Sequence, residues 1–190
     1  MLDITVHHAA DLSRGEISAV VSLLWNFWPN EDKTIDQVVE AFPEVGKQYR
    51  DAYPQVRLPS LHYVVWDGNK AVAYALTFER PVITNGGELS VMALSGVCVW
   101  PSYQGRGLGA EIVRRAFGRI DAGEFAVSLF QTTIPAFYEK LGATSVTNSF
   151  ANSRHKEHGS TNPWRYDSVM IYPKSYPWPE GPIDLNGPGY

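Results

Sequence analysis

Hydrophobic and polar residues recur at regular spacing through most of the chain, and this spacing predicts its elements. Residues 2–8 alternate in character and carry β-branched side chains, which indicates a first strand. From Ser13 to Trp28 apolar residues recur every three or four positions, as they do along one face of a helix. Glu16 follows Ser13 at the spacing of a capping box, so this helix should begin there.

The middle of the chain predicts a second helix and then an antiparallel meander. The helical region is expected over residues 34–53, with an interruption near Pro43 because proline has no amide proton to donate. Two turns rich in Asp, Asn and Gly are typical of hairpins. The strands that they join are expected over residues 61–66, 70–80 and 88–100.

The second half of the chain alternates helices and strands. The expected helices span residues 105–121 and 135–141, and the expected strands span residues 124–130, 144–150 and 168–172. The whole order predicts one mixed α/β (α+β) domain over residues 1–172, with a central, mostly antiparallel sheet flanked by helices. Residues 173–190 are rich in Pro and Gly and are expected to form an extended tail packed on that domain.

Composition and charge limit the classes of protein to which the chain can belong. It has 190 residues and a net charge of −4, with no basic patch of the kind that nucleic-acid binders show. The single cysteine, Cys98, excludes an internal disulfide, and His155 and His158 lack companion ligands, so no metal is expected. No apolar run is long enough to span a membrane, and the N-terminus lacks the features of a signal peptide. A cytoplasmic protein without membrane or nucleic-acid partners is therefore expected.

The segment from Val97 to Ala110 carries the clearest chemical signal. An apolar strand ends before Pro101, a turn with three alternating glycines follows, and a helix begins. Glycines at such a junction let a ligand approach the backbone, and the unpaired N–H groups at the start of the helix favour an anion. Arg106 adds a side chain suited to phosphate. The segment is thus expected to bind a phosphate group.

Two other phosphate-binding loops fit this segment less well. A dinucleotide fingerprint needs Gly-x-Gly-x-x-Gly, whereas the glycines here are Gly105, Gly107 and Gly109. A nucleotide-triphosphate loop needs Gly-Lys followed by Ser or Thr, and the sequence has no such run. A nucleotide-binding protein with the same turn, or a tight turn without a ligand, are the weaker alternatives.

Two segments resemble the signatures of the Gcn5-related N-acetyltransferase (GNAT) superfamily. Gln104-x-x-Gly107-x-Gly109 looks like the acyl-CoA signature of that family, and residues 136–143 (Ala-Phe-Tyr-Glu-Lys-Leu-Gly-Ala) resemble its second signature. They occur in the family's order, with a helix and a strand expected between them. The resemblance covers about residues 1–150.

The resemblance implies a site for acetyl-CoA as cosubstrate. The backbone amides of the turn would bind the CoA pyrophosphate, and the strand before the turn would pair with the pantetheine arm. The residues implied are Val97, Cys98, Val99, Gln104, Gly105, Arg106, Gly107, Leu108, Gly109 and Ala110. Gln131 stands where family members often have an asparagine, and its amide is expected to contact the cofactor or the surroundings of Tyr138.

The family transfers acyl groups, so the resemblance implies acetylation of a primary amine by direct attack on the thioester. Tyr138 matches the family tyrosine near the CoA sulfur and would be the acid that protonates the leaving thiolate. The backbone N–H of Val99, or of Cys98 beside it, would stabilise the oxyanion. The Cys98 side chain lies in an apolar strand and is expected to be core rather than a nucleophile.

The general base is not evident from the sequence. Some family members have a glutamate at the position of Ala93, and an alanine cannot accept a proton. Glu79, Glu88, His62 or an ordered water stay open as substitutes, although each side chain also has an ordinary structural interpretation. A CoA-binding module without catalysis is therefore an alternative function.

The acceptor is expected to be a small-molecule or peptide amine. Aromatic side chains that form either its pocket or part of the core are Trp25, Trp28, Tyr49, Tyr53, Trp164 and Tyr166. Residues 178–188 are somewhat similar to the C-terminus of the rhizobial nodulation N-acyltransferases, which leaves a longer acyl donor open. An extended strap is the other interpretation of this tail, and a homodimer is the assembly expected of an oligomer.

Overall fold

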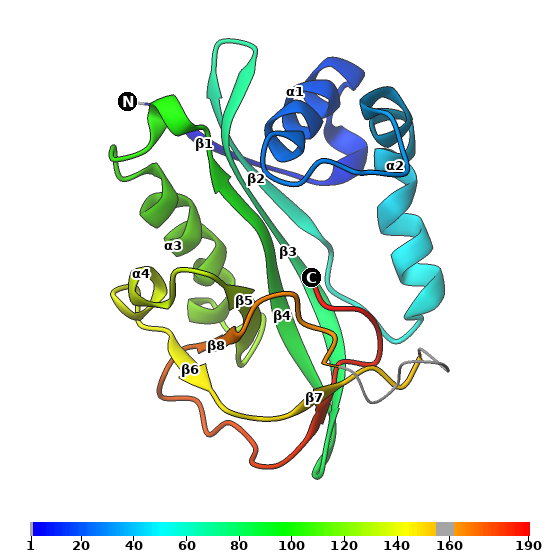
Figure 1. The fold of residues 1–190 in the computed structure, drawn as a ribbon, viewed down its shortest axis with the longest axis vertical. Coiled ribbons are helices and arrows are strands. Elements are labelled where there is room, and N and C mark those ends of the chain that lie inside the picture. The colour runs from blue at the N-terminus through cyan, green and yellow to red at the C-terminus, as the bar shows by residue number, and fades with distance from the viewer. Residues whose placement is uncertain (1, 155–161) are drawn as a thin grey trace. The chain divides into compact units, whose positions relative to one another are not determined.

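The structure is a computed structural model that describes residues 2–154 and 162–190 (Figure 1). His155 and His158, considered above as metal ligands, lie outside the described residues.

Contacts within the chain divide it into two compact units. The first unit contains Met1–Phe78 and Gly96–Ala116, and the second contains Glu79–Ser95 and Phe117–Tyr190. Residues 173–190, expected as a tail, belong to the second unit.

The described strands form one mixed sheet. They are β1 (Ile4–His7), β2 (Leu61–Asp67), β3 (Lys70–Thr84), β4 (Gly87–Val99), β5 (Ser128–Thr132), β6 (Thr144–Val146), β7 (Phe150–Ala151), β8 (Ser168–Tyr172) and β9 (Ile183–Asp184). Their order is β1-β2-β3-β4-β5-β8-β6, and β9 pairs with β3 and β7. The pairs β4–β5 and β7–β9 are parallel, whereas β1–β2, β2–β3, β3–β9, β5–β8 and β6–β8 are antiparallel. This confirms the predicted mixed α/β fold.

The described helices are η1 (Ala9–Asp11), α1 (Arg14–Trp25), α2 (Ile35–Ala52), η2 (Pro101–Tyr103), α3 (Leu108–Asp121) and α4 (Pro135–Glu139). Helix α1 begins as predicted, because the Ser13 amide donates to Glu16 Oε2 at 2.8 Å and the Glu16 amide donates to Ser13 Oγ at 3.3 Å. Ile17 and Val21 of α1 pack with Val39 of α2 in the first unit, where the two helices lie side by side (Figure 1).

Helix α2 contradicts the predicted interruption, because it continues through Pro43. A proline inside a helix costs about 3 kcal/mol through its lost donor and its ring. Pro43 is exposed, so its ring clashes with no core residue, and Phe42 next to it packs against the buried residues of the unit. Tyr49 in the following turns packs edge-on against Phe78, so tertiary contacts hold the helix on both sides of the proline.

The hairpin between β2 and β3 forms where the sequence predicts it. Asp67 pairs with Lys70 across a two-residue turn in which Gly68 has a φ of +58°. Several other boundaries differ from the predictions. Strand β5 begins at Ser128 rather than at residue 124, and α3 begins at Leu108 rather than near residue 105.

The second unit has its own core, and the last residues of the chain are part of it. Ile183 and Leu185 have no exposed surface and pack with Val82, Val91 and Leu129. The strand β9, which the sequence did not predict, pairs Ile83 with Asp184. The expected strand over residues 144–150 is divided into β6 and β7.

Candidate functional site

The glycine turn (residues 104–107) follows β4 and the short helix η2, and it ends at the N-terminus of α3. Gly105 has a φ of +74° and Gly107 a φ of +82°, a region of backbone conformation that favours glycine. A Cβ atom on either residue would meet no other atom within 4 Å, so the glycines are required by conformation and leave open space beside the backbone. Open space next to a glycine turn is what a bound phosphate needs.

Helix α3 supplies the N–H groups that point toward this space. Its first internal hydrogen bond runs from the Glu111 amide to the Gly107 carbonyl at 3.1 Å. The amides of Leu108, Gly109 and Ala110 precede that bond, so helix geometry gives them no acceptor within the helix. The helix is 14 residues long, and its dipole adds a partial positive charge at this end. The turn and the helix together therefore have the features that favour an anion, and binding there stays a prediction.

Side chains of the turn hold its shape. Gln104 Nε2 donates to the Val99 carbonyl at 3.0 Å, which ties the turn back to the end of β4. Arg106 Nη2 donates to the Ser102 carbonyl at 3.0 Å, and its guanidinium lies 5.0 Å from the centre of the Tyr103 ring. Arg106 is exposed, so its positive charge stands at the edge of the turn.

A second group of side chains braces the turn from the β2–β3 hairpin. The Tyr103 hydroxyl donates to the Asp67 carboxylate, and this hydrogen bond raises the pKa of Tyr103 above its usual value. Lys70 Nζ lies 4.5 Å from the centre of the Trp100 ring. The Trp100 amide donates to the Val72 carbonyl at 2.8 Å. Contacts from the hairpin therefore fix the residues that enter the turn.

The strand before the turn has an irregular backbone at Gly96. Strand β4 pairs with β5 at Met92↔Ser128 and Ala93↔Leu129. A few residues later Gly96 has a φ of +63°, which an extended strand does not adopt. This irregularity changes the course of the backbone immediately before Val97–Val99, the residues predicted to face the pantetheine arm.

Cys98 is core, as predicted. Its side chain is buried and packs with Val20, Leu23 and Tyr74. Burial raises the pKa of the Cys98 thiol to about 12, so the thiol is protonated at neutral pH. A protonated, buried thiol is a poor nucleophile.

Tyr138 belongs to the second unit and lies on the short helix α4. Its side chain is 5 % exposed, and its ring packs against Phe130 at 4.8 Å and edge-on against Phe137 at 4.9 Å. The Tyr138 carbonyl accepts from the amides of Leu141 at 2.9 Å and Ala143 at 3.1 Å. The tyrosine is therefore held firmly, and its role as an acid stays a prediction.

Gln131 has partners that the sequence did not predict. Its Nε2 donates to the Tyr190 carbonyl at 2.8 Å, and its Oε1 accepts from the amides of Arg165 and Tyr166, each at 2.8 Å. The amide thus joins β5 to the backbones of two other segments of the second unit, residues 165–166 and the C-terminal Tyr190. A contact between Gln131 and the cofactor stays a prediction. It would have to use the second N–H of the Gln131 side-chain amide, since Oε1 already accepts two hydrogen bonds.

None of the predicted substitutes for the missing base gains clear support. Ala93 is fully buried, Glu88 is exposed, and Glu79 Oε1 accepts from Ser90 Oγ at 2.8 Å. In the first unit, His62 Nδ1 lies 2.7 Å from the Tyr74 hydroxyl. Burial lowers the pKa of His62 to about 4, so its imidazole is neutral at pH 7 but too weak a base for an ammonium proton. The base stays unassigned.

The predicted acceptor aromatics include clear core residues. Tyr53 is 4 % exposed and Trp164 is 6 % exposed. Trp28 packs at the edge of the core of the first unit, and the Tyr49 and Tyr53 rings contact each other in a tilted arrangement with centres 4.7 Å apart. These contacts favour the core interpretation for most of the set, and the acceptor pocket stays a prediction.

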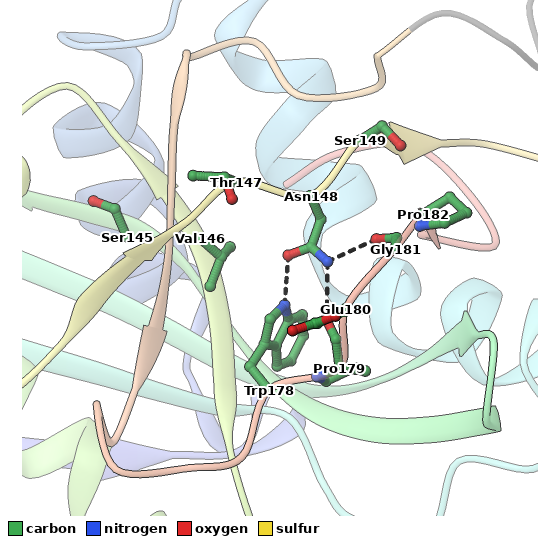
Figure 2. Close-up of a pocket in the computed structure, with 10 residues that line it drawn as sticks. All are labelled: Ser145, Val146, Thr147, Asn148, Ser149, Trp178, Pro179, Glu180, Gly181 and Pro182. Carbon is green, nitrogen blue, oxygen red and sulfur yellow. Dashed lines mark hydrogen bonds between the residues drawn. The ribbon is translucent and has the colours of Figure 1, made fainter.

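A cavity of about 620 Å³ lies elsewhere in the second unit, between residues 145–149 and residues 178–182 (Figure 2). Asn148 of the first segment bonds to the second, where it accepts from Trp178 Nε1 at 2.7 Å and donates to the carbonyls of Pro179 at 2.9 Å and Gly181 at 2.7 Å. No residue of the predicted acyl-CoA site lines this cavity. It is therefore a feature of the tail rather than part of that site.

Two features of the described residues bear on other classes of function. They contain no group of three or more His, Cys, Asp or Glu side chains placed to hold a metal ion. No helix within residues 2–154 and 162–190 is both long enough and apolar enough to cross a membrane.

Comparison with known proteins identifies relatives of the chain. A sequence model described as an acetyltransferase (GNAT) domain matches residues 28–146, which include the glycine turn and Tyr138. No curated protein matches the sequence significantly.

Solved structures share the fold at low sequence identity. An N-acetyltransferase of the GNAT family (YhbS) from Escherichia coli, solved in complex with CoA, is 14 % identical with a TM-score of 0.59, covering 97 % of this chain and 91 % of that one. Glucosamine-6-phosphate N-acetyltransferase from Arabidopsis thaliana is 15 % identical with a TM-score of 0.57, and the match covers 76 % of this chain and 94 % of that one. An acyl-CoA N-acyltransferase from Pseudomonas aeruginosa is 20 % identical with a TM-score of 0.52, covering 77 % and 89 %.

Proposed function

Because the chain belongs to the GNAT acetyltransferase family and is thus an acyltransferase, we propose that it transfers the acetyl group of acetyl-CoA to a primary amine by direct attack. The observation that carries the proposal is the glycine turn, with Gly105 and Gly107 at positive φ and open space beside them at the start of α3. A diphosphate fits this arrangement because backbone N–H groups and the helix dipole favour an anion there.

Two further features of the first unit support acyl-CoA as the ligand. Arg106 is exposed at the edge of the turn and adds a positive charge for a phosphate. The backbone of Val97–Val99 leads into the turn, and its N–H groups are the proposed donors to the pantetheine arm and the thioester carbonyl. An N–H donor aimed at the developing oxyanion is worth most where it is fixed in advance.

The chemistry asks for a neutral amine and a stable leaving group. An amine with a pKa of about 10.4 is neutral in roughly one molecule in two thousand at pH 7, so a base or a desolvating pocket matters most. A thiol with a pKa of about 8.5 leaves readily as thiolate, so protonation contributes less. We propose Tyr138 as the proton donor, on the strength of the second signature in residues 136–143.

The test is thermal stabilisation by acetyl-CoA, longer acyl-CoAs, free CoA, ATP and NAD. A ligand at a hundred times its dissociation constant stabilises the native state by about 2.7 kcal/mol, which gives a clear rise in melting temperature. Gly107→Glu should abolish the shift, since it places a bulky anion where the pyrophosphate would bind. Gly123→Glu is the matched control, because Gly123 has a φ of +79° and also no atom within 4 Å of a built Cβ.

The outcomes separate the possible functions. A shift with acetyl-CoA that survives in Gly123→Glu and is lost in Gly107→Glu supports the proposed site, and thiol release with a panel of amines then tests transfer. A larger shift with long acyl-CoAs would favour a longer acyl donor, and binding without turnover over a broad panel would favour a non-catalytic CoA-binding module. A shift with ATP or NAD but no CoA species would contradict the proposal.

A further inference from the structure

The irregular residue of β4, Gly96, lies against a tyrosine ring. A Cβ atom built on Gly96 would stand 3.1 Å from Tyr74 Cε1 and 3.4 Å from Tyr74 Cδ1. The third neighbour is Leu24 Cδ2 at 3.5 Å. The ring of Tyr74 therefore fills the space beside the backbone at the point where φ becomes positive, immediately before Val97–Val99.

Tyr74 is itself fixed by a single polar contact. The residue is 2 % exposed, and among the described residues its hydroxyl bonds only to His62 Nδ1, at 2.7 Å. A buried hydroxyl proton needs an acceptor, so the hydroxyl donates and Nδ1 accepts. The neutral imidazole then carries its proton on Nε2, and the lone pair of Nδ1 is already used. This assignment gives His62 a role other than that of general base.

His62 is held in turn by α2. Its imidazole is 7 % exposed, and its ring centre lies 5.3 Å from that of Phe42. A continuous line of packed groups thus runs from Phe42 through His62 and Tyr74 to the backbone of Gly96. All of these groups belong to the first unit.

From this geometry we infer that Tyr74, oriented by His62, is a positioning residue that fixes the backbone of β4 so that the N–H groups of Val97–Val99 meet the acyl carbonyl. The inference rests on the proposed function, since it concerns how that same strand holds the thioester. The contacts of the pair are with Phe42 and Gly96 rather than with the glycine turn, so its loss should affect the acyl group and spare the rest of CoA.

Three substitutions test the hydrogen bond between the Tyr74 hydroxyl and His62 Nδ1 while keeping the Tyr74 ring in place. Tyr74→Phe keeps the ring and removes the hydroxyl. His62→Leu leaves the hydroxyl without an acceptor, whereas His62→Asn restores one, because Asn Oδ1 occupies the place of Nδ1. Tyr172→Phe is the matched control, since it removes a hydroxyl that donates to Asp121 at 2.9 Å in the second unit.

The measurements are the dissociation constants of CoA and acetyl-CoA by calorimetry, and the carbonyl stretch of carbon-13-labelled acetyl-CoA by difference infrared spectroscopy. A well-aligned N–H donor lowers that frequency on binding. In Tyr74→Phe and His62→Leu we expect acetyl-CoA to bind about tenfold more weakly, the loss typical of one hydrogen bond, with CoA changed less than twofold. The frequency shift should disappear in both variants and return in His62→Asn.

A merely structural role for the pair would lower the melting temperature and leave the carbonyl frequency of bound acetyl-CoA unchanged, and that result would overturn the inference. Equal losses for CoA and acetyl-CoA would also overturn it. If the wild-type chain binds neither ligand, the proposed function itself fails, and this outcome is recognised before any variant is made.

Discussion

The glycine turn and the C-terminal segment are both irregular, and they are stabilised in opposite ways. In the turn, Gln104 bonds to Val99 and Arg106 to Ser102, so the partners are four or five residues apart. In the C-terminal segment, Arg80 bonds to Leu185 and Pro188, which are more than 100 residues away. The turn is thus specified by its own sequence, whereas the shape of the tail depends on residues scattered through the second unit.

The largest effect should come from Arg80, a buried distant partner of the tail. Arg80 is 3 % exposed, and its Nε and Nη2 donate to the carbonyls of Leu185 at 2.8 Å and Pro188 at 3.0 Å. Arg80→Met should lower the free energy of unfolding by about 3 kcal/mol, since it leaves two carbonyls without their charged donor. Urea denaturation measures the change.

An exposed arginine provides the control for Arg80. Arg114→Met on α3 should change stability by less than about 0.5 kcal/mol. Limited proteolysis should also cut the tail faster in Arg80→Met alone. Equal stability of the two variants would mean that the tail is held by apolar burial and not by the guanidinium.

A smaller loss is expected at Gln131, and it bears directly on the candidate site. Gln131→Leu removes three hydrogen bonds to backbone groups and should cost about 2 kcal/mol in urea unfolding. Gln131→Glu should cost less, because its carboxylate still accepts from the Arg165 and Tyr166 amides. If Gln131 has only a structural role, the affinity of Gln131→Leu for acetyl-CoA should stay within about twofold of the wild-type value, a difference of a few tenths of a kcal/mol in binding free energy. A tenfold weaker affinity at unchanged stability would instead make Gln131 a cofactor ligand.

The smallest effect on stability is expected at Ser13, which caps the N-terminus of α1 in the first unit. Ser13→Ala removes the cap of α1 and should cost about 1 kcal/mol. Hydrogen bonds from the Ser13 side chain and backbone lower the pKa of Glu16 below its usual value. A carboxylate with a lowered native pKa stabilises the fold above its unfolded pKa of about 4.3, and this contribution is lost as the pH falls through the native value.

The cost of Ser13→Ala should therefore be larger at pH 7 than at pH 3. Thermal unfolding at the two pH values measures it. Ser22→Ala, which removes an exposed hydroxyl bonded to the Ser18 carbonyl within the same helix, should show no such pH dependence. A penalty independent of pH would mean that the serine acts without the Glu16 carboxylate.

Local chemistry explains which parts of the fold could be predicted from the sequence. The capping box at Ser13, the hairpin at Gly68 and the glycine turn each depend on neighbouring residues, and each forms as expected. The break predicted at Pro43 is wrong because packing on both sides of the proline outweighs its local cost. Strand β9 was missed because two residues carry no periodicity, and its partners are distant in sequence.

In the candidate site, too, features set by neighbouring residues could be predicted from the sequence, and features set by distant residues could not. The turn and the preceding strand are predicted to be part of the site from glycine spacing and a family signature, and that role stays a prediction. The links between Gln131 and the tail, and between Tyr74 and Gly96, leave no pattern in the sequence, because each joins residues that approach only after folding. The only sign of the second link in the sequence is a histidine, His62, on one predicted strand and a tyrosine, Tyr74, on the next. The alternation of polar and apolar residues along the two strands does not show that these side chains bond to each other.

The order of the strands has a consequence for behaviour at high concentration. The strands at the two ends of that order, β1 and β6, have four and three residues, whereas β3 and β4 inside it have 15 and 13. Unpaired edges are templates on which other chains add strands, and short edges offer few hydrogen bonds to an incoming one. The long apolar strands are thus kept away from the positions where edge-to-edge aggregation would start.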